Sequence, residues 1–207
     1  MTLSAIEVNN LKQAPAVQGV LPVVHQRWSA RSFSARDVSQ ADLARVVEAA
    51  RWAASSSNEQ PWRFIVGVRN SLTHNKIFST LVGFNKAWAG SAPVLILGVA
   101  NTVFTHNGTP NTYAMYDLGA ASSYLTLEAA ALGLTTHQMA GYDHDAARQV
   151  LDIPESYALG SVIALGYQGE PADLANEQLI AREIAPRERK PLKELVFTAW
   201  GEPANLA

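Results

Sequence analysis

The sequence contains no cysteine, and this absence removes several kinds of chemistry at once. The 207-residue chain cannot form disulfides, thiolate nucleophiles, zinc–thiolate sites or iron–sulfur clusters. Charged residues make up only 16%, and the formal net charge is −2. This balance argues against the broad basic surface that nucleic acid or an acidic membrane requires. We therefore expect neither as a partner.

Several common enzyme motifs are also missing. Neither Gly-x-Gly-x-x-Gly, nor the Walker phosphate loop, nor a Gly-x-Ser-x-Gly elbow occurs. The five histidines show no metal-ligand spacing, which predicts that the protein has no metal site: His25, His74, His106, His137 and His144. We interpret His137 as a hydrogen-bonded structural group.

Long apolar runs and a targeting segment are lacking as well. The least charged stretch, residues 118–134, contains Glu128 and is shorter than a membrane-spanning helix requires. Residues 1–10 include Glu7 and lack the basic stretch and apolar run of a signal peptide. We therefore expect a soluble, cytoplasmic protein without a signal peptide.

Apolar residues make up 48% of the chain, enough for one domain. Residues 1–19 lack clear periodicity and are predicted to form an N-terminal arm, with a single domain over residues 20–207. Apolar spacing predicts helices over Ser39–Ala54, over Leu72–Leu81 and from near Asp143, a loop or turn over Gly83–Gly90, and strands over Pro61–Val68, Pro93–Val99, Thr135–Met139 and Ala158–Tyr167. After Gly169, four prolines predict a long tail without regular structure. Periodicity alone leaves α/β and α+β open.

A further predicted helix, Asn111–Leu132, has small or apolar residues around most of its circumference. Such a helix should be buried on more than one side. Two interpretations stay open: a central helix within one chain, or a helix for which a second copy of the chain supplies one wall.

Two short basic segments lie far apart in the sequence. Arg27, Ser29 and Arg31 alternate, so in extended geometry their side chains can converge on one anion or electron-rich ring edge. The segment Arg187–Lys190 is the second basic cluster. Each could be a solvated surface turn, but together they could neutralise one dianionic phosphate.

A polar segment, Ser55–Gln60, separates the first long helix from the first strand. The amides of Asn58 and Gln60 offer both donors and acceptors, which a uracil-like ring edge requires. The alternative is a plain turn at the helix end, capped by Asn58. Trp62 is interpreted as a core residue.

These segments, in this order, resemble the nitroreductase family of FMN enzymes. The resemblance rests on Arg27-x-Ser29-x-Arg31, on Ser-Ser-x-Asn-x-Gln-Pro-Trp leading into a strand, on Gly133-Leu134 with His137–Asp143, and on the ending Arg187–Glu194. It implies an α+β fold with a central, mostly antiparallel sheet flanked by helices. It also implies an intertwined homodimer with an extended C-terminal tail.

The resemblance assigns flavin contacts residue by residue. Arg27, Ser29 and Arg31 would hold the phosphate and the pyrimidine side, with the backbone of Trp28 close by. Arg187 and Arg189 would clamp the phosphate. Ser55, Ser56 and Asn58 would reach the flavin of the partner subunit, and Asn85 would bond the pyrimidine ring. The isoalloxazine would lie along Gln138, Met139, Ala140 and Gly141, with the Ala140 N–H aimed at N5. Ala54 and Ala140 depart from the family, which often has proline and an acidic residue there.

The resemblance implies an oxidoreductase in which NADH or NADPH reduces FMN, and electron-poor acceptors such as nitroaromatics or quinones then reoxidise it. No side chain would act as a nucleophile. One alternative keeps the fold and FMN but performs dehalogenation, flavin fragmentation or heterocycle oxidation. Another is a non-enzymatic dimer that binds a phosphate ligand.

Overall fold

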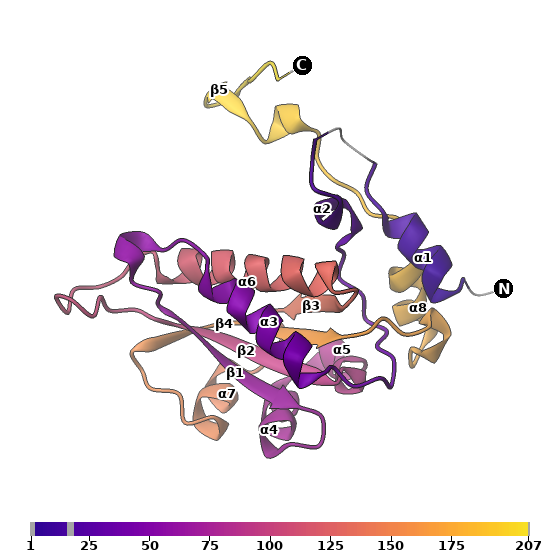
Figure 1. The fold of residues 1–207 in the computed structure, drawn as a ribbon, viewed down its shortest axis with the longest axis horizontal. Coiled ribbons are helices and arrows are strands. Elements are labelled where there is room, and N and C mark those ends of the chain that lie inside the picture. Colours follow the sequence, from indigo (N-terminus) through magenta and orange to yellow (C-terminus); the bar gives the residue numbers. More distant parts are fainter. Residues whose placement is uncertain (1–2, 16–18, 207) are drawn as a thin grey trace.

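The computed structural model describes residues 3–15 and 19–206. Its centre is an antiparallel sheet in the order β1-β2-β4-β3 (Figure 1). The strands are β1 (Trp62–Val68), β2 (Val94–Asn101), β3 (Thr135–Met139) and β4 (Tyr157–Gly166). The antiparallel pairing confirms the predicted sheet and decides between the two classes in favour of α+β.

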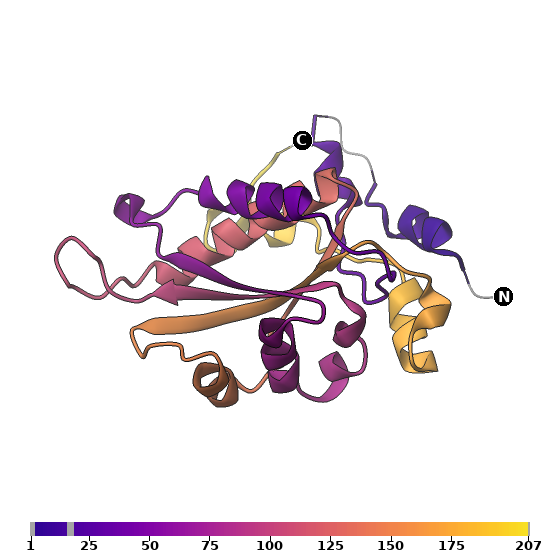
Figure 2. The same ribbon diagram turned by 60° about the horizontal axis from the view of Figure 1, so that its bottom comes forward.

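Helices cover both faces of the sheet (Figure 2). One face carries α3 (Gln40–Arg51) and α6 (Ala114–Ala131), and the other carries α4 (Leu72–Thr80), α5 (Gly83–Lys86) and α7 (His144–Val150). The core accordingly consists of two clusters separated by the sheet. Successive residues of β2 alternate between them, because side chains along a strand point to opposite faces: Ile96 packs with α3 and α6, and Leu95 and Leu97 pack with α4 and α7.

The predicted helices and strands of residues 39–167 are confirmed, with small shifts at their ends. The long apolar helix begins at Ala114 instead of Asn111, and the segment predicted as loop or turn contains α5. Single 3₁₀ turns stand at Ser56–Asn58, Ala89–Ser91, Pro171–Asp173 and Leu192–Glu194. Trp62 is buried in the core, as expected.

A smaller cluster of helices lies beside the sheet and corrects two predictions. It contains α1 (Ala5–Lys12) and α8 (Glu177–Ile184), and the short helix α2 (Pro22–Gln26) leads from it into the sheet domain. Val8, Trp28 and Ala30 form its buried centre. The predicted arm therefore contains a packed helix, and the segment after Gly169 is not free of regular structure. Residues 1–2 and 16–18 of that arm lie outside the described residues.

Both missed helices have local signals in hindsight. Ser4 and Glu7 form a reciprocal capping box at the start of α1, and the Asn176 side chain caps α8 by accepting from the Leu179 N–H. The prolines Pro171 and Pro186 stand on either side of α8 and do not interrupt it. Proline limits where a helix ends, and a segment between two prolines is free to form one.

The chain after Arg187 leaves the body as an extended tail and ends in a small hairpin, β5 (Phe197–Ala199) with β6 (Glu202–Pro203) (Figure 1). Its apolar side chains face solvent in the single chain, and Trp200 is 95% exposed. An exposed apolar stretch of this kind is typical of a surface that contacts another molecule. Among the described residues, no helix combines the length and apolarity needed to cross a membrane.

Gly67 marks the closest approach of α4 to the sheet. A Cβ at this position would lie 2.4 Å from the His74 backbone nitrogen, and backbone atoms cannot move aside as a side chain can. We expect Gly67→Ala to lower the free energy of unfolding by about 3 kcal/mol, by overpacking the β1–α4 contact. Urea denaturation would measure the loss. Gly119→Ala is the control, because a Cβ there meets nothing within 4 Å, and equal effects of the two substitutions would contradict this explanation.

Candidate functional site

The Arg27–Arg31 segment is held in place by a residue from the far end of the chain. Glu183 on α8 accepts the Arg31 N–H at 2.9 and 3.0 Å and the Ser32 N–H at 3.1 Å. The side chains of Arg27 and Ser29 point the same way, since Arg27 Nη1 donates to Ser29 Oγ at 3.4 Å. This contact places the side chains of Arg27 and Ser29 next to each other. The Arg31 guanidinium instead lies 3.8 Å from Glu183 and 5.7 Å from the Phe84 ring centroid.

The structure brings the two basic segments together. Arg187 donates from Nη1 to the Arg27 carbonyl at 2.6 Å and from Nη2 to the His25 carbonyl at 2.7 Å. Burial and the neighbouring charge of Arg189 lower the pKa of Arg27, and the pKa of Arg187 is lowered by burial and by the charges of Arg189 and Arg27. No carboxylate forms an ion pair with any of the three within the described part of the chain. Such a cluster of positive charge favours an anion.

A pocket of about 380 Å³ opens beside this cluster. Arg27 and Ser29 line it together with Gln138 at the edge strand β3, and α6 forms its other wall. Gln138 is fixed there, since its Nε2 donates to Thr126 Oγ1 at 3.3 Å and its Oε1 accepts from Ser161 Oγ at 3.1 Å. Three residues singled out from the sequence thus border one cavity.

Met139, Ala140 and Gly141 lie where β3 ends. Met139 is buried and Ala140 is exposed. Asn85, on α5, donates from Nδ2 to the Gly141 carbonyl at 3.1 Å. A Cβ at Gly141 would lie 2.7 Å from the same Nδ2, so glycine permits this close approach. The contact places Asn85 beside residues 140–141, although 56 positions separate it from Gly141 in the sequence.

The polar segment after α3 lies elsewhere. Ser55 and Ser56 line a second cavity of about 310 Å³ with Tyr113, Tyr116 and Asp117 of the α6 region, and none of these residues borders the Arg27 pocket. Where they come nearest on α6, the two cavities border residues six positions apart, Asp117 and Ser123, or roughly 9 Å along the helix axis. One chain therefore does not bring Ser55 and Ser56 to Arg27.

The backbone that follows Ser55 and Ser56 is strained. Ser57, Asn58 and Gln60 have φ angles of 53°, 54° and 51°, in the left-handed region that non-glycine residues seldom adopt. Residues in such conformations gather at binding sites, where the surrounding structure holds them. Here the Ser56 N–H donates to the buried carboxylate of Asp117 at 3.1 Å, and the Gln60 N–H donates to Ser55 Oγ at 3.0 Å.

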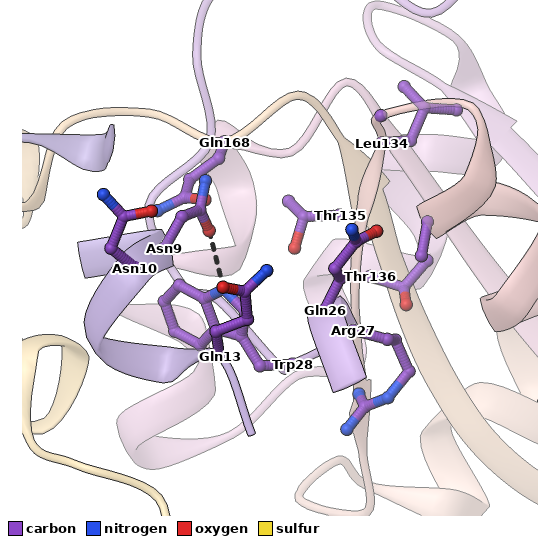
Figure 3. A pocket seen from close by; sticks show the side chains of 12 residues that line it. Asn9, Asn10, Gln13, Gln26, Arg27, Trp28, Leu134, Thr135, Thr136 and Gln168 are labelled. Atoms are coloured by element: carbon purple, nitrogen blue, oxygen red, sulfur yellow. Dashed lines mark hydrogen bonds between the residues drawn. The ribbon is translucent and has the colours of Figure 1, made fainter. Parts of the chain in front are cut away.

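A third cavity, of about 280 Å³, is also lined by Arg27 (Figure 3). Asn9 and Gln13 of the α1 region face Thr135 and Thr136 of β3 across it. The Trp28 ring forms part of its wall and donates from Nε1 to Asn9 Oδ1 at 2.8 Å. Trp28 is thus packed against α1, and its backbone stays beside Arg27 as the sequence order requires.

Sequence reasoning missed two residues of this region, Asp117 and Glu183. Each is a buried carboxylate that accepts backbone N–H groups of a predicted binding segment. Asp117 had a signal in the sequence, because it is one of only two charged residues in a helix of mostly small and apolar side chains. Glu183 had none, since it contacts Arg31 across 152 positions of sequence.

His137 lies behind the Arg27–Arg31 segment. Its Nδ1 is 3.0 Å from the Ala30 carbonyl oxygen, and its ring is 4.6 Å from that of Trp88, which confirms a hydrogen-bonded structural histidine. Burial, reinforced by the charge of Arg31, lowers the pKa of His137 to about 4. No group of three or more His, Asp or Glu residues that could hold a metal ion occurs in residues 3–15 and 19–206.

This histidine should make stability depend on pH. The unfolded chain takes up the proton near pH 6.5 and the folded protein only at a pKa of about 4, so protonation favours unfolding. The stabilising contribution is complete above pH 6.5 and decreases as the pH falls to 4, by roughly 3 kcal/mol. Urea denaturation at pH 7 and pH 4.5 would show the decrease, and His137→Gln should flatten it. Equal pH slopes for the two proteins would contradict the assignment.

Comparisons with known proteins identify relatives of this chain. The model of the nitroreductase family matches residues 24–167, more than half of the chain. An uncharacterised 15.4 kDa protein of Mycolicibacterium smegmatis is 37% identical over 149 residues, covering 68% of this chain and 99% of that protein. A putative NADH dehydrogenase/NAD(P)H nitroreductase of Archaeoglobus fulgidus is 29% identical over 157 residues, covering 74% of this chain and 87% of its own length.

A solved structure described as an oxidoreductase containing FMN superposes on 99% of this chain and 100% of its own, with a TM-score of 0.85 and 29% identity. The similarity thus extends beyond the segment matched by the family model to α1, α8 and the tail. From the fold, the converging motifs and the match over residues 24–167, we conclude that this chain belongs to the nitroreductase family.

Proposed function

We propose that the protein is an FMN-dependent oxidoreductase that takes electrons from NADH or NADPH and passes them to electron-poor acceptors such as nitroaromatics or quinones. One observation carries the proposal: Arg27 lines a cavity together with Ser29 and Gln138, and Arg187, bound to the Arg27 carbonyl, and Arg189 add positive charge near it. The names of the relatives and of the FMN-containing structure support it.

The residues present fit the chemistry of FMN. A phosphate would neutralise the cluster of three guanidiniums, with the Ser29 hydroxyl as a further donor. Arg31 Nε is buried and has no hydrogen-bond partner among the described residues. A buried donor without a partner costs free energy, which a ligand acceptor such as a flavin carbonyl would recover. The amides of Asn85 and Gln138 suit the pyrimidine and ribityl groups.

Bound FMN supplies the hydride-transfer chemistry, so no side chain has to act as a nucleophile. The contribution of the chain is to position and to stabilise charge. Arg31 would stabilise negative charge at the pyrimidine edge, and the Ala140 N–H would donate a hydrogen bond to N5. The exposure of Ala140 leaves this edge open to reactants. NAD(P)H and the acceptor would use the same opening in turn, which gives a ping-pong order.

We further propose that the working unit is a homodimer with two equivalent flavin sites at its interface. The cavity of Ser55 and Ser56 and the cavity of Arg27 are separate in one chain, and a second copy would bring one against the other. The exposed apolar tail and the outward side of α6, with Tyr116 78% exposed, offer the surface that such a dimer would bury.

The test is the visible absorbance of the purified protein, before and after anaerobic addition of NADH or NADPH. We expect flavin bands that bleach on addition and return with a nitroaromatic or quinone. Flavin recovered unchanged after many turnovers would exclude the fragmenting chemistry of related folds. A colourless protein that takes up no added FMN would contradict the proposal and favour a phosphate-binding protein without redox activity.

A further inference from the structure

Two buried charged residues lie beside the Arg27–Arg31 segment, and the proposed flavin contacts include neither. Glu183 is 0% exposed and Lys12 is 5% exposed. Both lie outside residues 24–167, the part matched by the family model. Burying a charge is costly unless it is paired and hydrogen-bonded, so the position of each needs a physical reason.

The Glu183 carboxylate binds the Arg27–Arg31 segment directly. Both of its oxygens accept the Arg31 N–H, and Oε1 also accepts the Ser32 N–H. Oε2 lies 3.8 Å from Arg31 Nη1, so the same carboxylate holds the backbone and the guanidinium of Arg31. Glu183 is the only carboxylate in an ion pair with Arg31 within the described residues.

Lys12 joins the N-terminal helix to the residues around Glu183. Its Nζ donates to the carbonyl oxygens of Arg182 and Ala185, in the last turn of α8, where a cation is favoured. The same Nζ lies 4.9 Å from the Trp28 ring centroid and attracts the charge of Glu183. Lys12 thereby fixes the helix end that carries Glu183 against the segment that Glu183 holds.

We propose that Glu183 is a positioning residue of the flavin site, acting through Arg31 and Ser32, and that Lys12 on α1 supports it. Without the carboxylate, two buried N–H groups lose their acceptor and the Arg31 guanidinium loses its anion. The segment that carries Arg27 and Ser29 would then no longer be held in one geometry. This inference rests on the proposed function, because it assumes that FMN binds at this segment.

The test compares Glu183→Gln with Leu179→Ala in the full-length protein. Glu183→Gln keeps nearly the same side-chain size but places an amide donor against backbone N–H groups. Leu179 lies on the same helix and is equally buried, but it packs in the core cluster beneath the sheet domain's second face. Shortening the Leu179 side chain should therefore lower stability without moving Arg31. FMN affinity is measured by fluorescence titration, stability by the thermal midpoint of the apoprotein, and flavin environment by visible circular dichroism at saturating FMN.

We expect Glu183→Gln to weaken FMN binding about tenfold and to change the dichroism of the bound flavin. Leu179→Ala should lower the thermal midpoint at least as much as Glu183→Gln does. Its FMN affinity should stay within about twofold of wild type. Glu177→Gln removes an exposed charge from the same helix, and it should change neither the FMN affinity nor the dichroism of the bound flavin. Two results would overturn the inference. One is a Glu183→Gln variant with unchanged FMN affinity and unchanged dichroism; the other is a Leu179→Ala variant that loses as much FMN affinity as Glu183→Gln.

Lys12→Met provides an independent test if Glu183→Gln does not fold. It removes the charge but keeps an unbranched side chain, and it should weaken FMN binding about threefold, whereas Lys76→Met on the distant helix α4 should not. Unchanged FMN affinity in Lys12→Met would remove Lys12 from the proposal. If Glu183→Gln also does not fold, the same result would overturn the entire inference. If the wild type itself binds no FMN, the proposed function fails; if it binds and the variants match it, this inference alone fails.

Discussion

Arg31→Ala is expected to weaken FMN binding between about tenfold and a hundredfold and to slow reduction by NAD(P)H. A hydrogen bond from a charged group contributes about 1.5–3 kcal/mol, and Arg31 has a buried Nε without a partner in the described residues to supply it. The substitution also leaves the buried Glu183 carboxylate without its guanidinium, so a lower thermal midpoint should accompany the loss of flavin. Flavin content after gel filtration and stopped-flow reduction would measure both effects.

Arg182→Ala is the matched control for Arg31→Ala. Its guanidinium lies 4.5 Å from the centroid of the same Phe84 ring but is exposed and outside the flavin segment. Removing it takes one positive charge from the neighbourhood, and we expect flavin content to stay within about twofold of wild type. If Arg31→Ala keeps wild-type flavin content and wild-type NAD(P)H oxidation, the assignment of Arg31 is wrong.

Ending the chain at Lys190 should convert the proposed dimer into a monomer that retains little FMN. The deletion removes the apolar side chains of Leu192, Leu195, Phe197 and Trp200, all exposed in the single chain. Burial of each large apolar side chain contributes about 1.5–3 kcal/mol, so we expect dimer affinity to fall by at least about a hundredfold. Sedimentation velocity and flavin content of the same sample would report the two consequences together.

A pair of tryptophan substitutions serves as the control for the deletion. Trp200 in the tail is 95% exposed and Trp52 at the end of α3 is 69% exposed. Trp200→Ser should weaken the dimer, and Trp52→Ser should leave it intact, although both remove the same exposed ring. A truncated chain that sediments with the mass of the full-length dimer would show that the tail does not hold the two copies together.

Much of the sheet domain could be predicted because its signals are local. The run Pro93–Val99 is apolar at every position except Gly98, as expected of a strand covered on both faces, and it is buried as β2. The small apolar residues of the long helix likewise predicted burial, and α6 contributes more residues to one core cluster than any other element does. In both cases the residues that specify the element lie within one short window.

The N- and C-terminal elements were not predicted because their stability depends on partners far away in sequence. Val8 is the only buried apolar side chain of α1, and it packs with Trp28 and Ala30 from beyond that helix. Similarly, α8 owes its position to Lys12, which contacts the end of that helix across 170 residues. Short helices are marginal by themselves, so tertiary contacts decide whether they form.

The sequence by itself determined the helices and strands of residues 39–167, a family resemblance that implies an antiparallel sheet, and the two basic segments as candidates for one anion site. Only the tertiary structure decided that Arg187 reaches the backbone of Arg27, that Glu183 holds Arg31, and that Ser55 and Ser56 line a cavity separate from Arg27. The physical reason is the separation in sequence between the residues that interact. Propensity and periodicity act between residues close in sequence, whereas the charge cluster and its buried carboxylate exist only after segments more than 150 positions apart have packed together.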